Sequence, residues 1–306
     1  MTSSPGAAPD PGTVLYPDGA VSVHGEISSL ADACIPAMDH GFLFGDSVYE
    51  VVRTLAGDPL AWPEHYDRLR ASATSLYMEL PWTRDAIGVR IVATIAATGL
   101  EECTVRMVVT RGPGAMSLLP DSCAGPRLVI YVLPLRLPPP EHLTDGIRIA
   151  VPSRLRNDLR ALAPSAKTGN YLNNLLALIE ARRAGGADAV MVNTSGHVTE
   201  GTTSNVFWVR DGIVRTASLD CGILSGITRY ELLAEMRRAG LTVEEGRFPL
   251  ADLTGADEAF LTGTVRGVTP VVDIDGQRIG VGRPGPITMR VAELLQKTLR
   301  AARGPW

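Results

Sequence analysis

The sequence predicts two α+β domains, and three observations support this fold class. The chain has 306 residues, of which 45% are hydrophobic and 20% are charged, which is enough for two separate cores. Runs typical of strands outnumber helical runs and show no regular β-α-β alternation, which argues against a doubly wound sheet. Four prolines within 134–140 interrupt the pattern, because proline fits neither a central strand nor a helix interior. We expect a first domain over 1–133, a linker over 134–141 and a second domain over 142–306.

The elements of the first domain follow from turn signals and from the periodicity of apolar residues. Asp18 and Gly19 predict the turn of a hairpin over 14–23, and a loop is predicted over 39–46. Thr83 suits the N-cap of a helix. Alternation predicts strands, and a 3.6-residue spacing predicts helices. These are strands over 47–54, 103–110 and 127–133, and helices over 64–78 and 83–98.

The same rules apply to the second domain, which contains no internal repeat. Asp211-Gly212 and Asp275-Gly276 are turn signals between strands. The predicted strands cover 146–151, 188–193, 203–209, 258–262 and 268–274. The predicted helices cover 170–180, 229–239 and 287–303.

Composition excludes several classes of protein. A net charge of −4 gives no reason to expect nucleic acid or an anionic membrane as a partner. The four cysteines are scattered and form no metal-ligand spacing, so neither a metal site nor a disulfide framework is expected. Residues 1–12 lack the apolar region of a signal peptide, and no apolar run is long enough to span a bilayer. These features predict a cytoplasmic protein.

Lys167 is the first candidate for chemistry. Among 29 Lys and Arg residues, only Lys167 and Lys297 are lysines. Arginine stays protonated and cannot form a Schiff base, so a lysine retained against this bias suits chemistry that needs a primary amine. Lys297 lies in the polar part of an amphipathic helix. On this argument alone, a solvated Lys167 left by chance is an equally good interpretation.

Two strands carry candidate substrate residues. Alternation places Tyr49, Val51 and Arg53 on one face of the strand over 47–54, and Arg106 lies on the strand over 103–110. An arginine beside apolar side chains suits a pocket that binds an anion. A strand-edge arginine that reaches solvent would give the same pattern.

Two turns could bind a phosphate group. Gly226 precedes a helix whose first amides, at Ile227 and Thr228, would be free to donate, and Thr264 and Val265 follow a glycine at the end of a strand. An ordinary glycine-rich helix entry would look the same. The chain has neither a Walker lysine nor a G-x-G-x-x-G motif, so nucleotides are poor candidates.

A lysine, a phosphate site and an acid together fit one cofactor, pyridoxal 5′-phosphate (PLP). PLP needs a Schiff-base lysine, anchors for its phosphate and an acidic partner for its pyridine nitrogen. Glu200, within the run Thr199-Glu-Gly-Thr-Thr-Ser-Asn205, is the candidate acid. A surface glutamate in a turn is the simpler interpretation of Glu200.

Six motifs, in this order, resemble those of fold-type IV PLP enzymes, the class IV aminotransferase family. They begin at Phe44, His65, Lys167, Thr199, Gly226 and Gly263. The resemblance runs from about residue 14 to 288 and implies a small N-terminal α/β domain, a larger C-terminal pseudo-barrel domain with PLP between them, and a homodimer. It further implies Lys167 as the lysine that bonds PLP and moves the proton at the substrate Cα, with Glu200 at the pyridine nitrogen. The implied contacts to the phosphate are Arg68, Ile227, Thr228 and Thr264. The implied contact to the phenolic oxygen is Tyr171. Seen without the resemblance, Arg68 could be a solvated helix residue and Tyr171 a half-buried core residue.

Within this family the chain is most similar to branched-chain aminotransferases, which place arginines where Arg53 and Arg106 stand. The match is imperfect, because Thr104 replaces their tyrosine and Gly267 their usual acid. D-amino acid aminotransferases carry cations in the loop that corresponds to 113–119, and this loop has none. Aminodeoxychorismate lyases carry Thr where Glu50 stands.

We therefore predict a PLP-dependent transaminase that moves an amino group between a branched-chain or other apolar amino acid and a 2-oxo acid such as 2-oxoglutarate or pyruvate. The expected substrate contacts are Tyr49, Val51, Arg53, Arg106, Thr264 and Val265. The alternatives are a PLP lyase of the aminodeoxychorismate type, a transaminase for D-amino acids or non-standard amines, and a homologue without activity.

Overall fold

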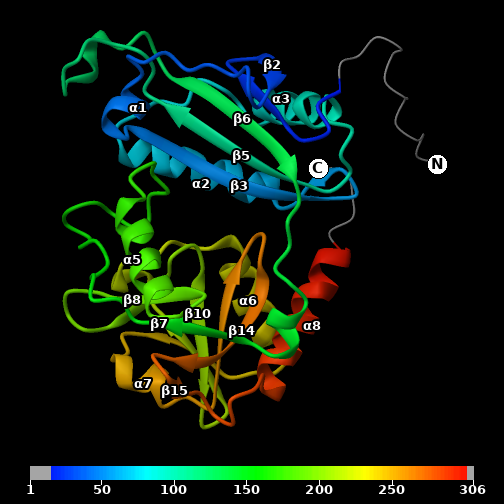
Figure 1. The fold of residues 1–306 in the computed structure, drawn as a ribbon, viewed down its shortest axis with the longest axis vertical. Coiled ribbons are helices and arrows are strands. Elements are labelled where there is room, and N and C mark those ends of the chain that lie inside the picture. Colours follow the sequence, from blue (N-terminus) through cyan, green and yellow to red (C-terminus); the bar gives the residue numbers. More distant parts are fainter. Residues whose placement is uncertain (1–14, 302–306) are drawn as a thin grey trace.

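The computed structural model describes residues 15–301, and its strands form two sheets. Figure 1 shows the two sheet units one above the other, joined by the segment that leaves β6. β6 ends at Pro134 and β7 begins at Ile147, so the change of sheet falls in the proline-rich part of the chain. The domain boundaries given above remain a prediction. No helix in this part of the chain is long and apolar enough to cross a membrane.

The first sheet is antiparallel and has the strand order β2-β1-β6-β5-β3-β4. Its strands are β1 (Ala20–Val23), β2 (Glu26–Ser29), β3 (Ser47–Leu55), β4 (Asp58–Pro59), β5 (Cys103–Thr110) and β6 (Arg127–Pro134). Helices α2 (Trp62–Ser75) and α3 (Arg84–Ala96) bury their apolar stripes on one face, where Leu69 and Ile91 pack against Val52 and Met107. The opposite face carries Tyr49, Val51 and Arg106 and is free to line a site.

Two local predictions in the first half were wrong. The hairpin joins β1 to β2 through His24 and Gly25, both with positive φ, whereas Asp18 lies in a turn before β1. The segment predicted as a loop contains the short helix α1 (His40–Phe44). Asp39 caps it by accepting from the Gly41 amide, and Gly45, with φ of 68°, ends it. The capping signal was present in the sequence, but five residues are too few for a helical periodicity.

The second sheet closes on itself. Its order is β12-β11-β10-β13-β14-β7-β8-β9, and β9 also pairs with β10. Strands β10, β13, β14, β7, β8 and β9 therefore form a six-stranded ring, and the ring closes through a single registered pair, Glu200 opposite Asn205. The strands are β7 (Ile147–Ala150), β8 (Asp188–Val192), β9 (Val198–Gly201), β10 (Asn205–Arg210), β11 (Ile213–Ala217), β12 (Val243–Gly246), β13 (Glu258–Gly263), β14 (Gly267–Ile274) and β15 (Gln277–Arg278). This ring is the expected pseudo-barrel.

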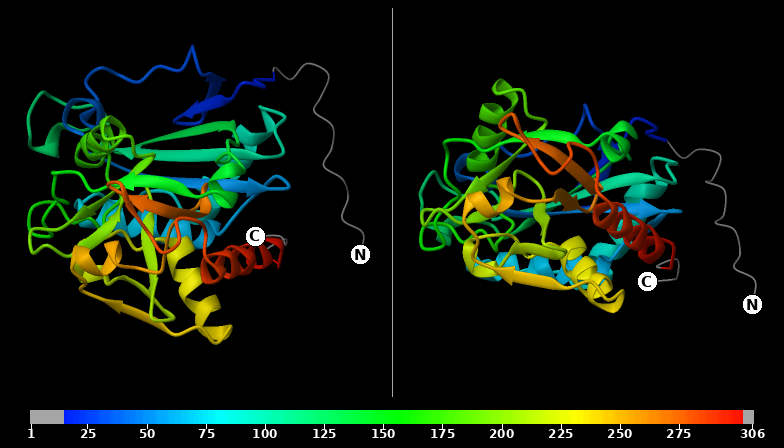
Figure 2. Two further views of the ribbon diagram at one scale, coloured as in Figure 1. Left: turned by 60° about the horizontal axis from the view of Figure 1, so that its bottom comes forward. Right: turned by 90° about the horizontal axis from the view of Figure 1, so that it is seen from below.

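Alternation along the ring separates two cores. One set of side chains, which includes Trp208 and Leu261, forms a cluster that Leu253 of α7 (Leu250–Thr254) joins. The alternate set, which includes Phe207 and Phe260, packs against α6 (Ile227–Arg238) and α8 (Pro286–Ala301). Figure 2 shows these two helices side by side on one side of the barrel. The remaining helices are α4 (Glu141–Thr144) and α5 (Leu172–Arg183), with 3₁₀ turns at Pro120–Ser122 and Leu219–Cys221.

Candidate active site

A cavity of about 490 Å³ lies between the two sheets and collects nearly all of the predicted site residues. Those that line it are Tyr49, Val51, Arg68, Arg106, Lys167, Tyr171, Glu200, Ile227, Thr228, Thr264 and Val265. Arg53 is not among them. It lies farther along β3 and lines a separate cavity of about 50 Å³ beside Ile227 and Thr264. The expected contact of Arg53 with substrate therefore has no support in this geometry.

Lys167 belongs by sequence to the second half of the chain, but its backbone is bound to the first. Its carbonyl accepts from the Tyr49 amide at 2.9 Å, and its own amide donates to Ser72 Oγ at 3.0 Å. This close pairing leaves little room for a side chain at Gly169, since a Cβ there would lie 2.1 Å from Ser47 Oγ and would require that hydroxyl to rotate away. The Lys167 Nζ atom lies 4.5 Å from the centre of the Tyr49 ring. The amine thus lies over the face of an aromatic ring inside the cavity.

Arg68 is oriented by a buried carboxylate. Its Nε and Nη2 donate to the two oxygens of Glu50 at 2.7 and 2.9 Å, and its Nη1 donates to the Ser225 carbonyl. His65 Nδ1 lies 2.7 Å from Glu50 Oε2. Burial raises the pKa of Glu50, but the bonds from Arg68 and His65 outweigh burial and lower that pKa to about 2. Burial also lowers the pKa of His65. Arg68 is therefore a fixed cation next to the start of α6.

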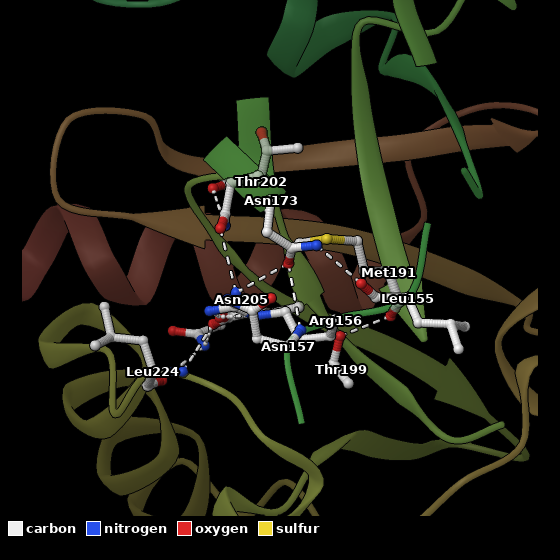
Figure 3. Close-up of polar contacts among 11 residues, drawn as sticks. Leu155, Arg156, Asn157, Asn173, Met191, Thr199, Thr202, Asn205 and Leu224 are labelled. Atoms are coloured by element: carbon white, nitrogen blue, oxygen red, sulfur yellow. Dashed lines mark hydrogen bonds and ion pairs between the residues drawn. The ribbon is translucent and has the colours of Figure 1, made fainter. Parts of the chain in front are cut away.

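Glu200 is buried at the seam of the barrel. Arg156 donates to its Oε1 through Nη2 at 2.8 Å and through Nε at 3.1 Å. Its Oε2 accepts from the Leu224 amide at 2.9 Å and from Asn205 Nδ2 at 3.3 Å. Burial raises the pKa of Glu200, while Arg156 and the Leu224 amide act in the opposite direction. Figure 3 shows this network around Arg156 and Asn205. The interpretation of Glu200 as a surface residue in a turn is wrong, because this residue lies on β9 and is only 5% exposed.

Tyr171 stands at the start of α5, and its ring meets that of Tyr49 edge to face at 5.6 Å. Burial and the neighbouring Tyr49 raise the pKa of Tyr171 above its usual value. Its hydroxyl therefore stays protonated near neutral pH and is available as a hydrogen-bond donor.

The start of α6 forms an anion cradle. Gly226 occupies the N-cap, and no side chain caps the helix. A Cβ at this position would lie 2.0 Å from Asn205 Oδ1, so the approach of the helix to β10 depends on glycine. The amides of Ile227 and Thr228 start the helix beside Arg68 and carry the positive end of its dipole. Thr264 reaches the same cavity from the turn after β13.

A second buried pair fixes that turn. Arg266 Nη2 donates to Asp188 Oδ2 at 2.6 Å, and the Thr202 hydroxyl donates to Asp188 Oδ1 at 2.5 Å. Asp188 is 1% exposed. Through these two contacts it links the turn that contains Thr264 to the end of β9, the strand that contains Glu200.

Sequence reasoning missed Glu50, Arg156, Asp188 and Arg136. Glu50 shares a face with Val48 and Val52, and an acid on a buried face is a signal that could have indicated a buried cationic partner. Arg156 and Arg136 lie in irregular segments, where periodicity carries no information. Their positions depend on how the two sheets meet.

Comparisons with known proteins agree with this geometry. The family model for amino-transferase class IV matches residues 47–274. The branched-chain-amino-acid aminotransferase of Pseudomonas aeruginosa is 33% identical over 92% of this chain and 91% of that protein. The D-alanine aminotransferase of Listeria monocytogenes is 32% identical over 93% of this chain and 97% of that protein.

Solved structures show the same likeness. A T.th. branched-chain amino acid aminotransferase, solved with N-(5′-phosphopyridoxyl)-L-glutamate, has a TM-score of 0.87 and 29% identity over 94% of this chain and 96% of that chain. The same enzyme solved with 4-methylvaleric acid has a TM-score of 0.86 at the same identity and coverage.

Proposed function

The chain belongs to the class IV aminotransferase family and is a PLP-dependent transaminase, and from this premise we propose its substrates and the roles of its residues. We propose that it moves an amino group between a branched-chain or other apolar amino acid and a 2-oxo acid such as 2-oxoglutarate. The observation that carries this proposal is that Lys167, Glu200 and Arg68 converge on one cavity from different parts of the chain.

The donors and acceptors of this cavity fit PLP. We propose that Arg68, the Ile227 and Thr228 amides and the Thr264 hydroxyl hold the phosphate, because together they offer a cation and several neutral donors. Tyr171 would donate to the phenolic oxygen, and Glu200 would face the pyridine nitrogen. When bound, PLP supplies an aldehyde that condenses with amines and a ring that withdraws electrons.

The residues of the chain do the remaining work. The Lys167 amine would bond the cofactor and, once released, carry the proton that leaves and returns at the substrate Cα. Arg156 keeps Glu200 in place with two donors, so that the carboxylate stays aimed at one position. The buried setting of Glu200 strengthens its interaction with a positive charge, because few water molecules screen it.

The cavity suits two substrates that share an α-carboxylate and differ in their side chains. The Thr264 and Val265 turn offers backbone donors for the shared carboxylate, while Tyr49 and Val51 give an apolar wall. The Arg106 guanidinium lies 4.0 Å from the centre of the Tyr49 ring and is free to bind a distal carboxylate. The complexes of the T.th. enzyme with a glutamate adduct and with 4-methylvaleric acid support both kinds of ligand.

We further propose a homodimer in a reducing compartment such as the cytoplasm. Large apolar side chains are exposed at Phe42 (76%), Leu118 (84%) and Leu172 (62%). The first lies on α1, the second in the β5–β6 loop and the third on α5, and Figures 1 and 2 show these three segments along the same side of the molecule. Exposed apolar side chains on neighbouring segments favour association. All four cysteines are free thiols.

A panel of amino donors tests the proposal. Wild-type holoenzyme, mixed with single amino acids, should lose the absorbance of the lysine-bound cofactor with apolar L-amino acids, and 2-oxoglutarate should restore it. Lys167→Ala should abolish turnover, and borohydride should fix the cofactor to the peptide that contains Lys167. Lys297→Ala is the matched control, because it removes the other lysine, on α8.

A label on Lys297, or normal turnover by Lys167→Ala, would contradict the assignment. The D-alanine aminotransferase relatives make chirality a question for the same panel. Turnover with D-amino acids in preference to their L-enantiomers would replace the proposed substrate class while leaving the transaminase in place.

A further inference from the structure

The charges that line the active-site cavity are unevenly paired. Five arginines line it, and three of them have a buried carboxylate partner. The distances from guanidinium nitrogen to carboxylate oxygen are 2.7 Å for Arg68 and Glu50, 2.8 Å for Arg156 and Glu200, and 2.6 Å for Arg266 and Asp188. The other two, Arg106 and Arg136, make no ion pair with any residue between 15 and 301. The cavity therefore contains two arginine charges that no carboxylate in this part of the chain pairs with, in addition to the Lys167 amine.

One unpaired arginine comes from the first sheet, and the other comes from the segment that leaves this sheet after β6. Arg106 projects from the middle of β5, opposite Val51 of β3 and Tyr131 of β6. Arg136 lies two residues beyond the end of β6, and the hydrogen bond from the Leu135 amide to the Glu102 carbonyl holds the chain next to the start of β5 as far as Leu135. Leu137 and Pro138 line the cavity together with Arg136. The segment that crosses between the sheets in Figure 1 therefore forms a wall of the site and is more than a connection.

This placement separates the two kinds of cation by function. Arg68 and Arg156 are satisfied by the protein and serve groups whose position is fixed. Arg106 and Arg136 are exposed, so their charges meet a carboxylate only when a ligand brings one. A monocarboxylate that uses the Thr264 and Val265 turn leaves both arginines unpaired, whereas a dicarboxylate supplies a second negative group to them.

We propose that Arg136 is a specificity-determining residue that, together with Arg106, selects dicarboxylic 2-oxo acids and amino acids at this site. This inference rests on the proposed transaminase cavity and deepens it by naming the residue that distinguishes substrates with a distal carboxylate from apolar ones. Arg136 is a binding residue and takes no part in proton transfer.

Equilibrium binding of two unreactive acids to the holoenzyme tests the inference without turnover. Glutarate carries two carboxylates, and 4-methylpentanoate carries one with an apolar chain. Loss of a charge-assisted contact predicts that Arg136→Gln weakens glutarate binding about tenfold or more, with a change of less than about threefold for 4-methylpentanoate. Arg136→Lys should recover part of the loss, since it restores the charge but not the planar fork. Arg183→Gln, an exposed arginine on α5 that does not line the cavity, controls for the change of net charge.

Single-turnover rates with 2-oxoglutarate and with 4-methyl-2-oxopentanoate should show the same split between the two ligand classes. Equal weakening of both acids, an effect of Arg183→Gln as large as that of Arg136→Gln, or unchanged glutarate binding would each overturn the inference. Failure of the wild-type enzyme to transaminate any 2-oxo acid would instead overturn the proposed substrates. The two failures are therefore distinguishable.

Discussion

At the scale of single residues, the site consists of cations that other residues hold in place. Glu50 is the clearest case, because it is completely buried and accepts from both Arg68 and His65. Removing it would leave the Arg68 guanidinium without its carboxylate next to the phosphate cradle. Glu50 therefore serves both stability and cofactor binding.

The pH dependence of stability should reveal this role. Glu50 has its pKa lowered from 4.5 to about 2, so its contribution is fully present above pH 4.5 and is lost as the pH falls towards 2. That difference corresponds to about 3 kcal/mol. The lowered pKa of His65 also reduces the free energy of unfolding as the pH falls below about 6.5. The reason is that His65 is protonated in the unfolded chain before it is protonated in the folded protein.

We expect Glu50→Gln to lower the free energy of unfolding at pH 7 by about 3 kcal/mol, and the deficit to shrink below pH 4.5. Urea unfolding of the cofactor-free proteins between pH 3 and 7 measures it. Glu79→Gln, at an exposed glutamate, is the control and should follow wild type. Curves for Glu50→Gln that run parallel to wild type across the whole range would contradict this account.

At the scale of elements, the cofactor cradle depends on how closely α6 approaches β10. The approach is set by Gly226 and by Asn205, which donates to both Glu200 and the Leu224 carbonyl. A methyl group at Gly226 would have to displace Asn205. The change would therefore disturb the phosphate end and the pyridine end of the site together.

Gly226→Ala should weaken PLP binding by about tenfold or more, because overpacking a tight contact costs about 1–3 kcal/mol. Absorbance titration of the apoenzyme with PLP gives the dissociation constant. In an Asn205→Ala background the clash is gone, so the same substitution should cost less than about threefold. Additive effects in the double variant would rule out the contact as the cause.

The same scale explains what the sequence could and could not predict. Alternation located β3 and β5 because each has eight or more residues, and Thr83 marked the start of α3 through a cap that the structure contains. The four-residue β9 was missed, because its pattern is too short to separate from a turn. Motifs with their own chemistry, such as that of Lys167, could be found without a fold. Partners such as Arg156 could not, because they become neighbours of Glu200 only through long-range packing.

At the scale of the whole molecule, the proposed cofactor contacts join two units. Arg68 lies on α2 beneath the first sheet, and Glu200 lies in the barrel. The Lys167 segment already crosses between them through its bonds to β3 and Ser72. A ligand that binds Arg68, Lys167 and Glu200 at once would couple the unfolding of both units.

PLP at 100 times its dissociation constant should stabilise the protein by about 2.7 kcal/mol, which raises the melting temperature by about 4 °C for a protein of this size. Scanning calorimetry of the apo and holo forms measures it. Pyridoxal, which lacks the phosphate, should stabilise less, because it cannot engage the cradle beside Arg68. Two separate calorimetric transitions, of which PLP raises only one, would show that the units do not share the ligand.

The closure of the barrel has a consequence for the newly made chain. The ring closes through one pair, Glu200 opposite Asn205, and both residues belong to the network proposed to hold PLP. Until the cofactor arrives, that joint rests on this pair, on the short turn between β9 and β10 and on the hydrogen bonds of Glu200, and opening it would expose the edges of β9 and β10. Free strand edges recruit other strands, so chains made faster than PLP is supplied would be prone to aggregate. Vitamin B6 supply during expression should thus govern how much folded protein a cell accumulates, as well as how active that protein is.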